Sequence, residues 1–431
     1  MVAAEIKIWS LNVGAVIWDR ERNLAVMEFE QDFLDQNIDL APLTMPIGKL
    51  RQGNRTFSFP TLNEITFNKL PGLLADSLPD TFGNTLIDIW LTQNGKSPDD
   101  FTPVERLCYV GTRGMGALEF APTIQIRTTD PEDIQLNELV EIAKEVMNQK
   151  QALETSFKSE KTRALQQIIE VGTSAGGMRP KAIIAVHNSD GKIISGYHNA
   201  SKEYAHWILK FDGIQDDIFN EPQGYGTIEY VYSLLAGKAG ITMAECKLLH
   251  EGDRSHFMTK RFDRENGEKV HMQTLNGIAH YDFNNIGSTS YEQLFQVMRT
   301  LKLGHDEIEQ MYRRLVFNVV ARNQDDHTKN TAFLLERGGS WKLSPAYDIT
   351  YSFNPNVGKN TNKHQMSVNG KREEISREDL TKIAEHINLK RSNKIIDHIV
   401  ESVSNWQLLA KEHGLETDRV EKIEKNLRLD L

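Results

Sequence analysis

The sequence predicts an α+β protein with two lobes, preceded by a small β-meander. Strand-like alternation of apolar and polar residues occurs within the first 60 residues and again between residues 181 and 211, whereas helical periodicity dominates from about residue 285. The length of 431 residues also exceeds that of one ordinary domain. We therefore expect an N-terminal subdomain of β-meander and helices at residues 1–125, a β-rich lobe at 126–260 and a helical lobe at 261–431.

The N-terminal subdomain is predicted from short apolar alternations followed by a turn-rich corner. Ile6-Lys-Ile-Trp9 and Ala15-Val-Ile-Trp18 alternate like paired strands. The segment 70–80, with sequence LPGLLADSLPD, carries the Pro, Gly and Asp residues that end and start helices. Asp80 or Thr81 is predicted to cap the next helix.

The two lobes are predicted from their periodicity. In the β-rich lobe, we expect a helix that starts at Asp130-Pro131, a second helix at residues 164–169, strands at 181–186 and 205–211, and a hairpin turn at Asp190-Gly191. The buried face of the first helix is Leu139, Ile142, Ala143 and Val146. In the helical lobe, a helix buries Met311, Leu315, Val316 and Val319, and Ser376-x-x-Asp379 predicts a capped helix start.

Composition and charge exclude several classes of protein. A hydrophobic content of 39% and a charged content of 26% are typical of globular chains. The net charge of −10 argues against a broad nucleic-acid-binding surface. Cys108 and Cys246 stand alone, which supports neither a disulfide framework nor a zinc site. With no signal-peptide pattern and no apolar run of roughly 18 residues, the sequence predicts a cytoplasmic protein without membrane contact.

The densest polar run is Asn323-Gln-Asp-Asp-His-Thr-Lys-Asn330, between an amphipathic helix and an apolar strand. Phosphoryl transfer needs a carboxylate to orient the attacking hydroxyl and oxygen ligands for Mg²⁺, and Asp325 and Asn330 supply them. Their spacing matches that of the catalytic loop of protein kinases, although the preceding His-Arg is absent. The alternative is a polar loop that only makes local turns and caps.

A predicted hairpin follows this run and returns the chain to it. Phe333-Leu-Leu, the turn Gly338-Gly339 and Trp341-Lys-Leu lead to Asp348. In protein kinases an Asp after such a hairpin binds Mg²⁺, and Asp348 is predicted to have that role.

Three further segments are candidates for nucleotide binding. The Gly-rich segment 172–181, ending in Lys181, would let backbone N–H groups approach phosphates, although it lacks the P-loop pattern and could be a plain loop. Lys210 ends a strand and is predicted to contact the α- and β-phosphates, oriented by Glu229, unless it is only an exposed strand-end lysine. The connector 258–264 could bind adenine through its backbone, with Phe262 against the base, or could be an ordinary edge strand.

Five motifs in order resemble signatures of the HipA family of serine/threonine kinase toxins. They are the segment 70–80, the loop from Ser174 to Lys181, Arg261-Phe-Asp-Arg264, Asp325-x-His-x-Lys-Asn330 and Ser344-Pro-Ala-Tyr-Asp348. The resemblance covers essentially the whole chain, and the late run His364-Gln-Met-Ser-Val-Asn-Gly-Lys371 is also similar to the family. It implies a protein-kinase-like fold with ATP and Mg²⁺ as cofactors.

The resemblance also implies roles for individual residues. Asp325 would be the catalytic Asp, Asn330 and Asp348 the metal ligands, and Ser174 the site of inactivating autophosphorylation. The nucleotide-binding residues would be Gly176, Gly177, Met178, Arg179, Pro180, Lys181, Lys210, Lys260, Arg261, Phe262, His327, Thr328, Lys329, Asn330, Tyr347 and Asp348. Two residues depart from the family pattern. Asp326 replaces a common Gly and would add negative charge near the phosphates, and Lys260 replaces an acidic residue.

The partners expected from the family are a small helix-turn-helix antitoxin of the HipB type and a protein substrate, for which glutamyl-tRNA synthetase is a candidate. Operator DNA would be contacted mainly through the antitoxin. Two other functions stay open on the residues alone. One is a catalytically weak kinase-fold binding module that acts as a co-repressor with the antitoxin, and the other is a small-molecule phosphotransferase.

Overall fold

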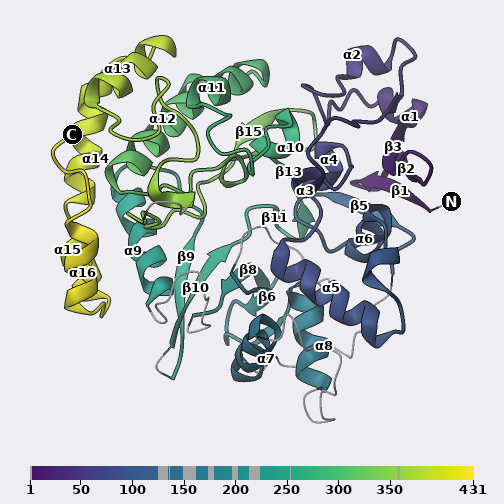
Figure 1. Cartoon of the computed structure of the whole chain (residues 1–431), viewed down its shortest axis with the longest axis horizontal. Coiled ribbons are helices and arrows are strands. Elements are labelled where there is room, and N and C mark those ends of the chain that lie inside the picture. Colours follow the sequence, from purple (N-terminus) through teal and green to yellow (C-terminus); the bar gives the residue numbers. More distant parts are fainter. Residues whose placement is uncertain are drawn as a thin grey trace.

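The structure is a computed structural model of the chain, and it describes residues 2–124, 134, 136–148, 162–172, 179–196, 202–212, 224–252, 254–356 and 360–431. Figure 1 shows the N-terminal subdomain and the C-terminal helices at opposite ends of the molecule, with the second sheet between them on one side. The predicted α+β fold is confirmed, with the larger sheets in the N-terminal part of the chain and mainly helices in the C-terminal part.

The N-terminal subdomain is built on a five-stranded antiparallel sheet in the order β4-β3-β2-β1-β5. The strands are β1 Ala3–Ile8, β2 Leu11–Asp19, β3 Leu24–Phe29, β4 Thr56–Phe57 and β5 Leu118–Ala121, and the helices are α1 Gln31–Leu34, α2 Ile47–Leu50, α3 Glu64–Phe67, α4 Gly72–Ala75, α5 Thr81–Gln93, η1 Pro98–Asp100 and α6 Pro103–Val110. Alternate strand residues are buried, because successive side chains point to opposite faces of the sheet. The predicted meander is therefore confirmed.

The second sheet also has five strands, in the order β7-β6-β8-β10-β9. Its strands are β6 Lys181–His187, β7 Ile193–Ser195, β8 Tyr204–Lys210, β9 Cys246–Glu251 and β10 Arg254–Lys260. Helices α7 Leu136–Asn148 and α8 Thr162–Val171 share a hydrophobic core with this sheet and with α5. Helix α9 Tyr225–Lys238 packs on β9 and β10, toward the helical lobe (Figure 1).

The helical lobe surrounds a small antiparallel sheet in the order β13-β14-β15. Its elements are β11 Arg264–Glu265, β12 Glu268–Lys269, β13 His271–Thr274, α10 Leu275–Ala279, α11 Tyr291–Thr300, α12 His305–Val320, η3 Thr328–Asn330, β14 Ala332–Leu335, β15 Trp341–Leu343, η4 Asn360–Asn362, α13 Arg377–His386, α14 Ser392–Val403, α15 Trp406–Glu412 and α16 Thr417–Glu424. One large core joins these helices to α9, with Tyr232, Tyr312 and Trp406 fully buried in it.

Most local predictions are confirmed where the structure describes the residues. Asp80 is the N-cap of α5, since its side chain accepts from Gly83 N, and Ser376 and Asp379 form a capping box. The predicted buried face of α7 is buried. Asp130-Pro131, the expected start of that helix, lies outside the described residues, and the described part begins at Leu136. In the part of the chain that the structure describes, every helix is too short or too polar to cross a lipid bilayer.

Candidate active site

The candidate site begins where α12 ends. Ala321 caps the helix and Arg322 adopts a left-handed backbone conformation (φ 57°), which turns the chain out of the helical direction. The following residues 323–330, here called the 323–330 loop, contain no regular structure except the 3₁₀ turn η3 at their end. Because β14 follows directly and pairs with β13 and β15, both ends of the loop are held by packed elements.

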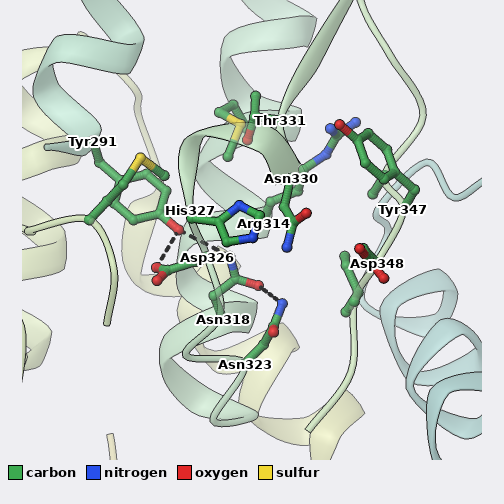
Figure 2. A pocket seen from close by; sticks show the side chains of 14 residues that line it. Tyr291, Arg314, Asn318, Asn323, Asp326, His327, Asn330, Thr331, Tyr347 and Asp348 are labelled. Carbon is green, nitrogen blue, oxygen red and sulfur yellow. Dashed lines mark hydrogen bonds between the residues drawn. The ribbon is translucent and has the colours of Figure 1, made fainter. Parts of the chain in front are cut away.

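The β14–β15 hairpin returns the chain to this loop, as predicted. The Tyr347 hydroxyl donates to the Lys329 carbonyl at 2.6 Å, which places the next residue, Asp348, beside the loop. Asp348 has a φ of 55°, a conformation that non-glycine residues rarely adopt and that is common at functional sites. Figure 2 shows Asn330 and Asp348 facing the same space from two different segments.

A partly buried lysine between two carboxylates is the strongest electrostatic feature of the site. Lys210 Nζ lies 2.5 Å from Glu229 Oε1 of α9 and also contacts Asp348 Oδ1. The predicted Lys210–Glu229 pair is therefore present. Burial disfavours the charged forms, but the Lys210 ammonium holds the pKa of Asp348 at about 2, and the two carboxylates raise the pKa of Lys210. For Glu229 burial outweighs Lys210, so its pKa lies above its ordinary value.

Asp325 has a fixed backbone and an accessible carboxylate. Its amide donates to Ser352 Oγ at 2.9 Å, and its carbonyl accepts from Asn330 Nδ2 at 2.8 Å. Its side chain is 47% exposed, and His327 Nε2 lies 3.9 Å away. Partial desolvation and the nearby charge of Asp348 raise the pKa of Asp325 above its ordinary value. A raised pKa makes this carboxylate a better proton acceptor.

The Asp326 carboxylate is held by residues from distant parts of the helical lobe. Its carboxylate is buried and accepts hydrogen bonds from the Tyr291 hydroxyl at 2.8 Å and from Gln365 N at 2.7 Å. His364 Nδ1 lies 2.9 Å away. Figure 2 shows Asp326 directed toward Tyr291, on the other side of the loop from Asp348. The carboxylate is thus turned inward and its hydrogen bonds are satisfied there, while it also lines the pocket beside Asn330 and Asp348 and its charge helps to raise the pKa of Asp325.

The remaining loop residues are held against the surrounding structure. The His327 ring lies 5.5 Å from the Phe283 ring, and the Lys329 ammonium lies 4.5 Å from the same ring. Thr328 is buried and donates to the Tyr281 carbonyl. Burial lowers the pKa of Lys329, against the opposing charges of Asp76 and Asp80. These contacts hold the side chains of the loop against Phe283 and Tyr281.

The connector 260–262 is only partly directed toward the site. Lys260 is exposed and pairs with Glu245 at 3.0 Å. The Arg261 amide donates to the His206 carbonyl, and the Arg261 guanidinium binds the buried Asp263. The backbone N–H and the side chain of Arg261 therefore both bind other parts of the protein. The Phe262 ring lies 5.5 Å from the Tyr347 ring, beside the site. Of the three side chains, Phe262 is the one placed to reach a ligand.

The segment that precedes β6 is described only from residue 179. Ser174, Gly176, Gly177 and Met178 lie outside the described residues. The Arg179 guanidinium lies 4.3 Å from the Tyr225 ring, and the buried Pro180 accepts from Phe211 N. Lys181 is 2% exposed, and its ammonium binds Asp80 at 2.8 Å.

Sequence reasoning missed the two acidic residues of the 70–80 segment as part of this site. Asp80 was predicted only as a helix cap, yet its second carboxylate oxygen binds Lys181. Asp76 accepts hydrogen bonds from Thr274, and burial raises its pKa to about 6, with Lys329 opposing the rise. Repeated Asp residues in a turn-rich corner were a signal, but nothing in the chain order shows which lysines they approach.

The pocket behind Asn330 and Asp348 is small and has a mixed polar and apolar lining. Its cavity volume is about 20 Å³, room for about one water molecule, so it is the floor of a site and not a chamber for a whole ligand. Figure 2 shows it. The lining residues are Tyr291, Met311, Arg314, Asn318, Asn323, Asp326, His327, Asn330, Thr331, Ala346, Tyr347, Asp348, Ile349 and Met366. Within the described residues, His327 Nδ1 and Arg314 Nε are buried without a hydrogen-bond partner.

The donors at the site fit Mg²⁺ held together with a phosphate group. Among the described side chains, no three His, Cys, Asp or Glu residues are grouped as metal ligands, so a cage made by the protein alone is not indicated there. Mg²⁺ is commonly bound by one or two protein oxygens together with substrate phosphates and water. The Asp348 carboxylate and the Asn330 amide oxygen match that arrangement.

Comparisons with known proteins give matches to both halves of the chain. A model of the HipA N-terminal domain matches residues 4–121, and a model of the HipA-like C-terminal domain matches residues 173–407. A Haemophilus influenzae protein named "Putative kinase" is 23% identical over 195 residues, which are 41% of this chain and 52% of that protein. The chain thus matches about half the length of this relative.

A solved structure has the same overall fold as this chain. HipA of Shewanella oneidensis MR-1, in a complex with HipB and its operator DNA, has a TM-score of 0.66 at 17% identity, over 98% of this chain and 94% of that chain. The Helicobacter pylori proinflammatory kinase CtkA has a TM-score of 0.33 at 14% identity, over 52% of this chain and 88% of that chain. At the first score the overall fold is shared, whereas the second is too low to support an argument.

Proposed function

The chain belongs to the HipA family, and from that premise we propose that it is a serine/threonine protein kinase that transfers the γ-phosphoryl group of Mg-ATP to a protein acceptor. One observation carries the proposal. Lys210 binds both Glu229 and Asp348, and the charge of Asp348 acts on the accessible carboxylate of Asp325. A paired lysine, a metal-binding carboxylate and a proton-accepting carboxylate are the groups that kinases use for phosphoryl transfer.

Asp325 is proposed to orient the acceptor hydroxyl and to receive its proton. The hydroxyl oxygen forms a bond to the γ-phosphorus, the bond from that phosphorus to the β–γ bridging oxygen breaks, and ADP leaves. The position of Asp325 suits this role, because its backbone is anchored by Ser352 and Asn330 while its carboxylate remains accessible. The raised pKa increases its strength as a base.

Lys210 is proposed to bind the α- and β-phosphates while Glu229 keeps the ammonium in place. Mg²⁺, bound by Asp348 and Asn330, would neutralise charge on the phosphate oxygens. The segment Gly176, Gly177, Met178, Arg179, Pro180 and Lys181 would cover the phosphates. Adenine would lie at the connector Lys260–Phe262, near Tyr347, and His327, Thr328 and Lys329 would complete the nucleotide site.

The test is transfer of labelled phosphate from Mg-ATP to the protein itself and to proteins of a cell extract. Asp325→Asn is isosteric and should lower transfer by about 10²–10⁴-fold, the usual contribution of an acid–base group. Asp397→Asn, at an exposed surface pair with Arg377, is the matched control and should transfer normally. Transfer by Asp325→Asn at the wild-type rate would exclude this role for Asp325.

We further propose that the protein is the toxin of a toxin–antitoxin pair. The HipA of Shewanella oneidensis was solved with HipB and its operator DNA, which supports a HipB-like antitoxin and operator DNA as partners. By the family resemblance, this antitoxin would be a helix-turn-helix protein that makes most of the contact with DNA. The net charge of −10 would complement a basic antitoxin. Glutamyl-tRNA synthetase is the first acceptor to test. Mass spectrometry after incubation with ATP should find phosphate on Ser174, and an active preparation without it would exclude self-inactivation at that residue.

A further inference from the structure

An unbroken chain of hydrogen bonds links the Asp325 backbone to the Asp326 carboxylate. The Asp325 amide donates to Ser352 Oγ at 2.9 Å, and Ser352 donates to Asn323 Oδ1 at 3.1 Å. Asn323 Nδ2 donates to Asn318 Oδ1 at 2.9 Å, and Asn318 Nδ2 donates to the Tyr291 hydroxyl at 3.0 Å. Tyr291 then donates to Asp326 Oδ2 at 2.8 Å. Figure 2 shows the last three of these bonds.

Every hydrogen bond of this chain is donated in the same direction, from Asp325 toward Asp326. A backbone N–H can only donate and an ionised carboxylate can only accept hydrogen bonds, so the Asp325 amide and the Asp326 carboxylate set the two ends of the chain, and the direction of the bonds between them follows. Burial and the nearby Asp326 raise the pKa of Tyr291 well above its ordinary value, which keeps the proton on the hydroxyl. Hydrogen bonds that point the same way in a buried chain strengthen one another.

The chain joins four separate parts of the helical lobe. Tyr291 is the first residue of α11, Asn318 lies near the end of α12, Asn323 and Asp326 belong to the 323–330 loop, and Ser352 lies in the segment after β15. Tyr291, Asn318, Asn323 and Asp326 are all buried. A buried chain of this kind allows little freedom, because a broken bond leaves a buried polar group without its partner.

The other contacts of Asp326 extend the link to the late sequence run at residues 364–371. Gln365 N donates to Asp326 Oδ1, and His364 Nδ1 lies at hydrogen-bond distance from Oδ2. His364 is 2% exposed and Gln365 is 6% exposed. The carboxylate therefore connects the late run with the loop that carries Asp325.

We propose that Asp326 is a positioning residue, whose buried carboxylate orients this hydrogen-bond chain and thereby fixes the backbone of Asp325. The catalytic consequence rests on the proposed function, whereas the fixing of the loop does not. In Asp326→Asn the side chain keeps its size but presents one donor and one acceptor. The direction of the bonds between Ser352 and Tyr291 is then no longer imposed, so the Ser352 hydroxyl, which accepts from the Asp325 amide, loses part of its restraint.

The experiment compares three variants by phosphate transfer and by hydrogen exchange of the peptide that spans the 323–330 loop. Asp326→Asn changes one end of the chain, and Ser352→Ala removes the bond at the Asp325 end. Asp379→Asn is the matched control, because Asp379 is also a buried carboxylate with several donors, which are Asn369, Lys371 and Ser376. None of those donors belongs to the chain that reaches Asp325.

Asp326→Asn should lower kcat by about 10- to 100-fold while the KM for ATP changes much less, since a displaced base slows the chemical step. Exchange in the loop should accelerate in Asp326→Asn and in Ser352→Ala, but not in Asp379→Asn. The two chain variants should also be non-additive in kcat when combined. A folded Asp326→Asn that matches Asp379→Asn in kcat and in loop exchange would overturn the proposal.

The two proposals fail in different ways. If the wild type transfers no phosphate, the proposed function is wrong, and hydrogen exchange alone then decides whether Asp326 fixes the loop. If Asp326→Asn does not fold, Ser352→Ala gives the answer, because Ser352 is only half-buried and loses a single hydroxyl. Unchanged loop exchange and unchanged kcat in Ser352→Ala would overturn the proposal in that case.

Discussion

Asp263 is the point at which one substitution should most weaken the attachment of the N-terminal subdomain. It is fully buried and binds the Arg261 guanidinium through two hydrogen bonds of 2.9 and 2.7 Å, and Arg264 at 2.8 Å. The same carboxylate accepts from Gly116 N at 2.7 Å, and both arginines donate to the Gly114 carbonyl. Asp263→Asn keeps the shape of the side chain but leaves two guanidinium groups without their carboxylate.

The expected cost follows from the burial of these charges. Breaking a buried ion pair by removing one partner destabilises a protein by about 3–5 kcal/mol, because the remaining charge is neither hydrated nor neutralised. A whole domain is stable by only about 5–15 kcal/mol. We therefore expect Asp263→Asn to lose about 3–5 kcal/mol in free energy of unfolding at pH 7, measured by urea denaturation.

The pH dependence provides a second measurement of the same interaction. Burial alone would raise the pKa of Asp263, but Arg261 and Arg264 hold it well below its ordinary value. Its contribution to stability is therefore complete above the unfolded-state pKa, near 4, and is lost as the pH falls below that value toward the depressed folded-state pKa. The difference in stability between wild type and Asp263→Asn should narrow as the pH is lowered below about 4.

The control for this prediction is Asp397→Asn, whose partner Arg377 is also exposed, and this change should cost less than about 1 kcal/mol. Arg264→Met keeps the ion pair between Arg261 and Asp263. It replaces Asp263→Asn as the test variant if Asp263→Asn does not fold. A loss below about 1 kcal/mol in Asp263→Asn, or a difference from wild type that does not change in acid, would refute the reasoning.

Three further substitutions test other parts of the structure. Lys210→Met leaves Glu229 and Asp348 without their shared cation. Phosphate transfer should fall by at least about 100-fold, and the free energy of unfolding should fall as well. Near-normal transfer would contradict the phosphate-binding role of Lys210. Asp80→Asn keeps the helix cap but removes the charge that Lys181 binds. The free energy of unfolding in urea should therefore fall by about 3 kcal/mol. An unchanged midpoint of the urea unfolding curve would contradict the pairing of Asp80 with Lys181. Tyr232→Phe removes the hydroxyl that donates to the Ala321 carbonyl at 2.7 Å, at the end of α12. The free energy of unfolding, measured by heat or urea, should fall by about 1–3 kcal/mol. A variant as stable as the wild type would show that this hydrogen bond contributes nothing.

The sequence by itself determined the features that depend on neighbouring residues. The meander, the cap at Asp80, the capping box at Ser376 and the hairpin that leads to Asp348 all follow from periodicity and turn chemistry within a few residues. The grouping of Asp325, Asn330 and Asp348 was also predicted, because one short hairpin separates them. The pairing of Lys210 with Glu229 was expected from its likeness to kinases and not from local pattern.

Only the tertiary structure decided what each charged group contacts. Asp325 and Asp326 are adjacent and chemically identical, yet one carboxylate is accessible and the other is buried against Tyr291. Asp80 meets Lys181 across 101 positions of the chain, and Lys210 meets Asp348 across 138. The physical reason is that burial and the nearest opposite charge determine the state of a carboxylate, and both are set by the packing of segments that are distant in sequence.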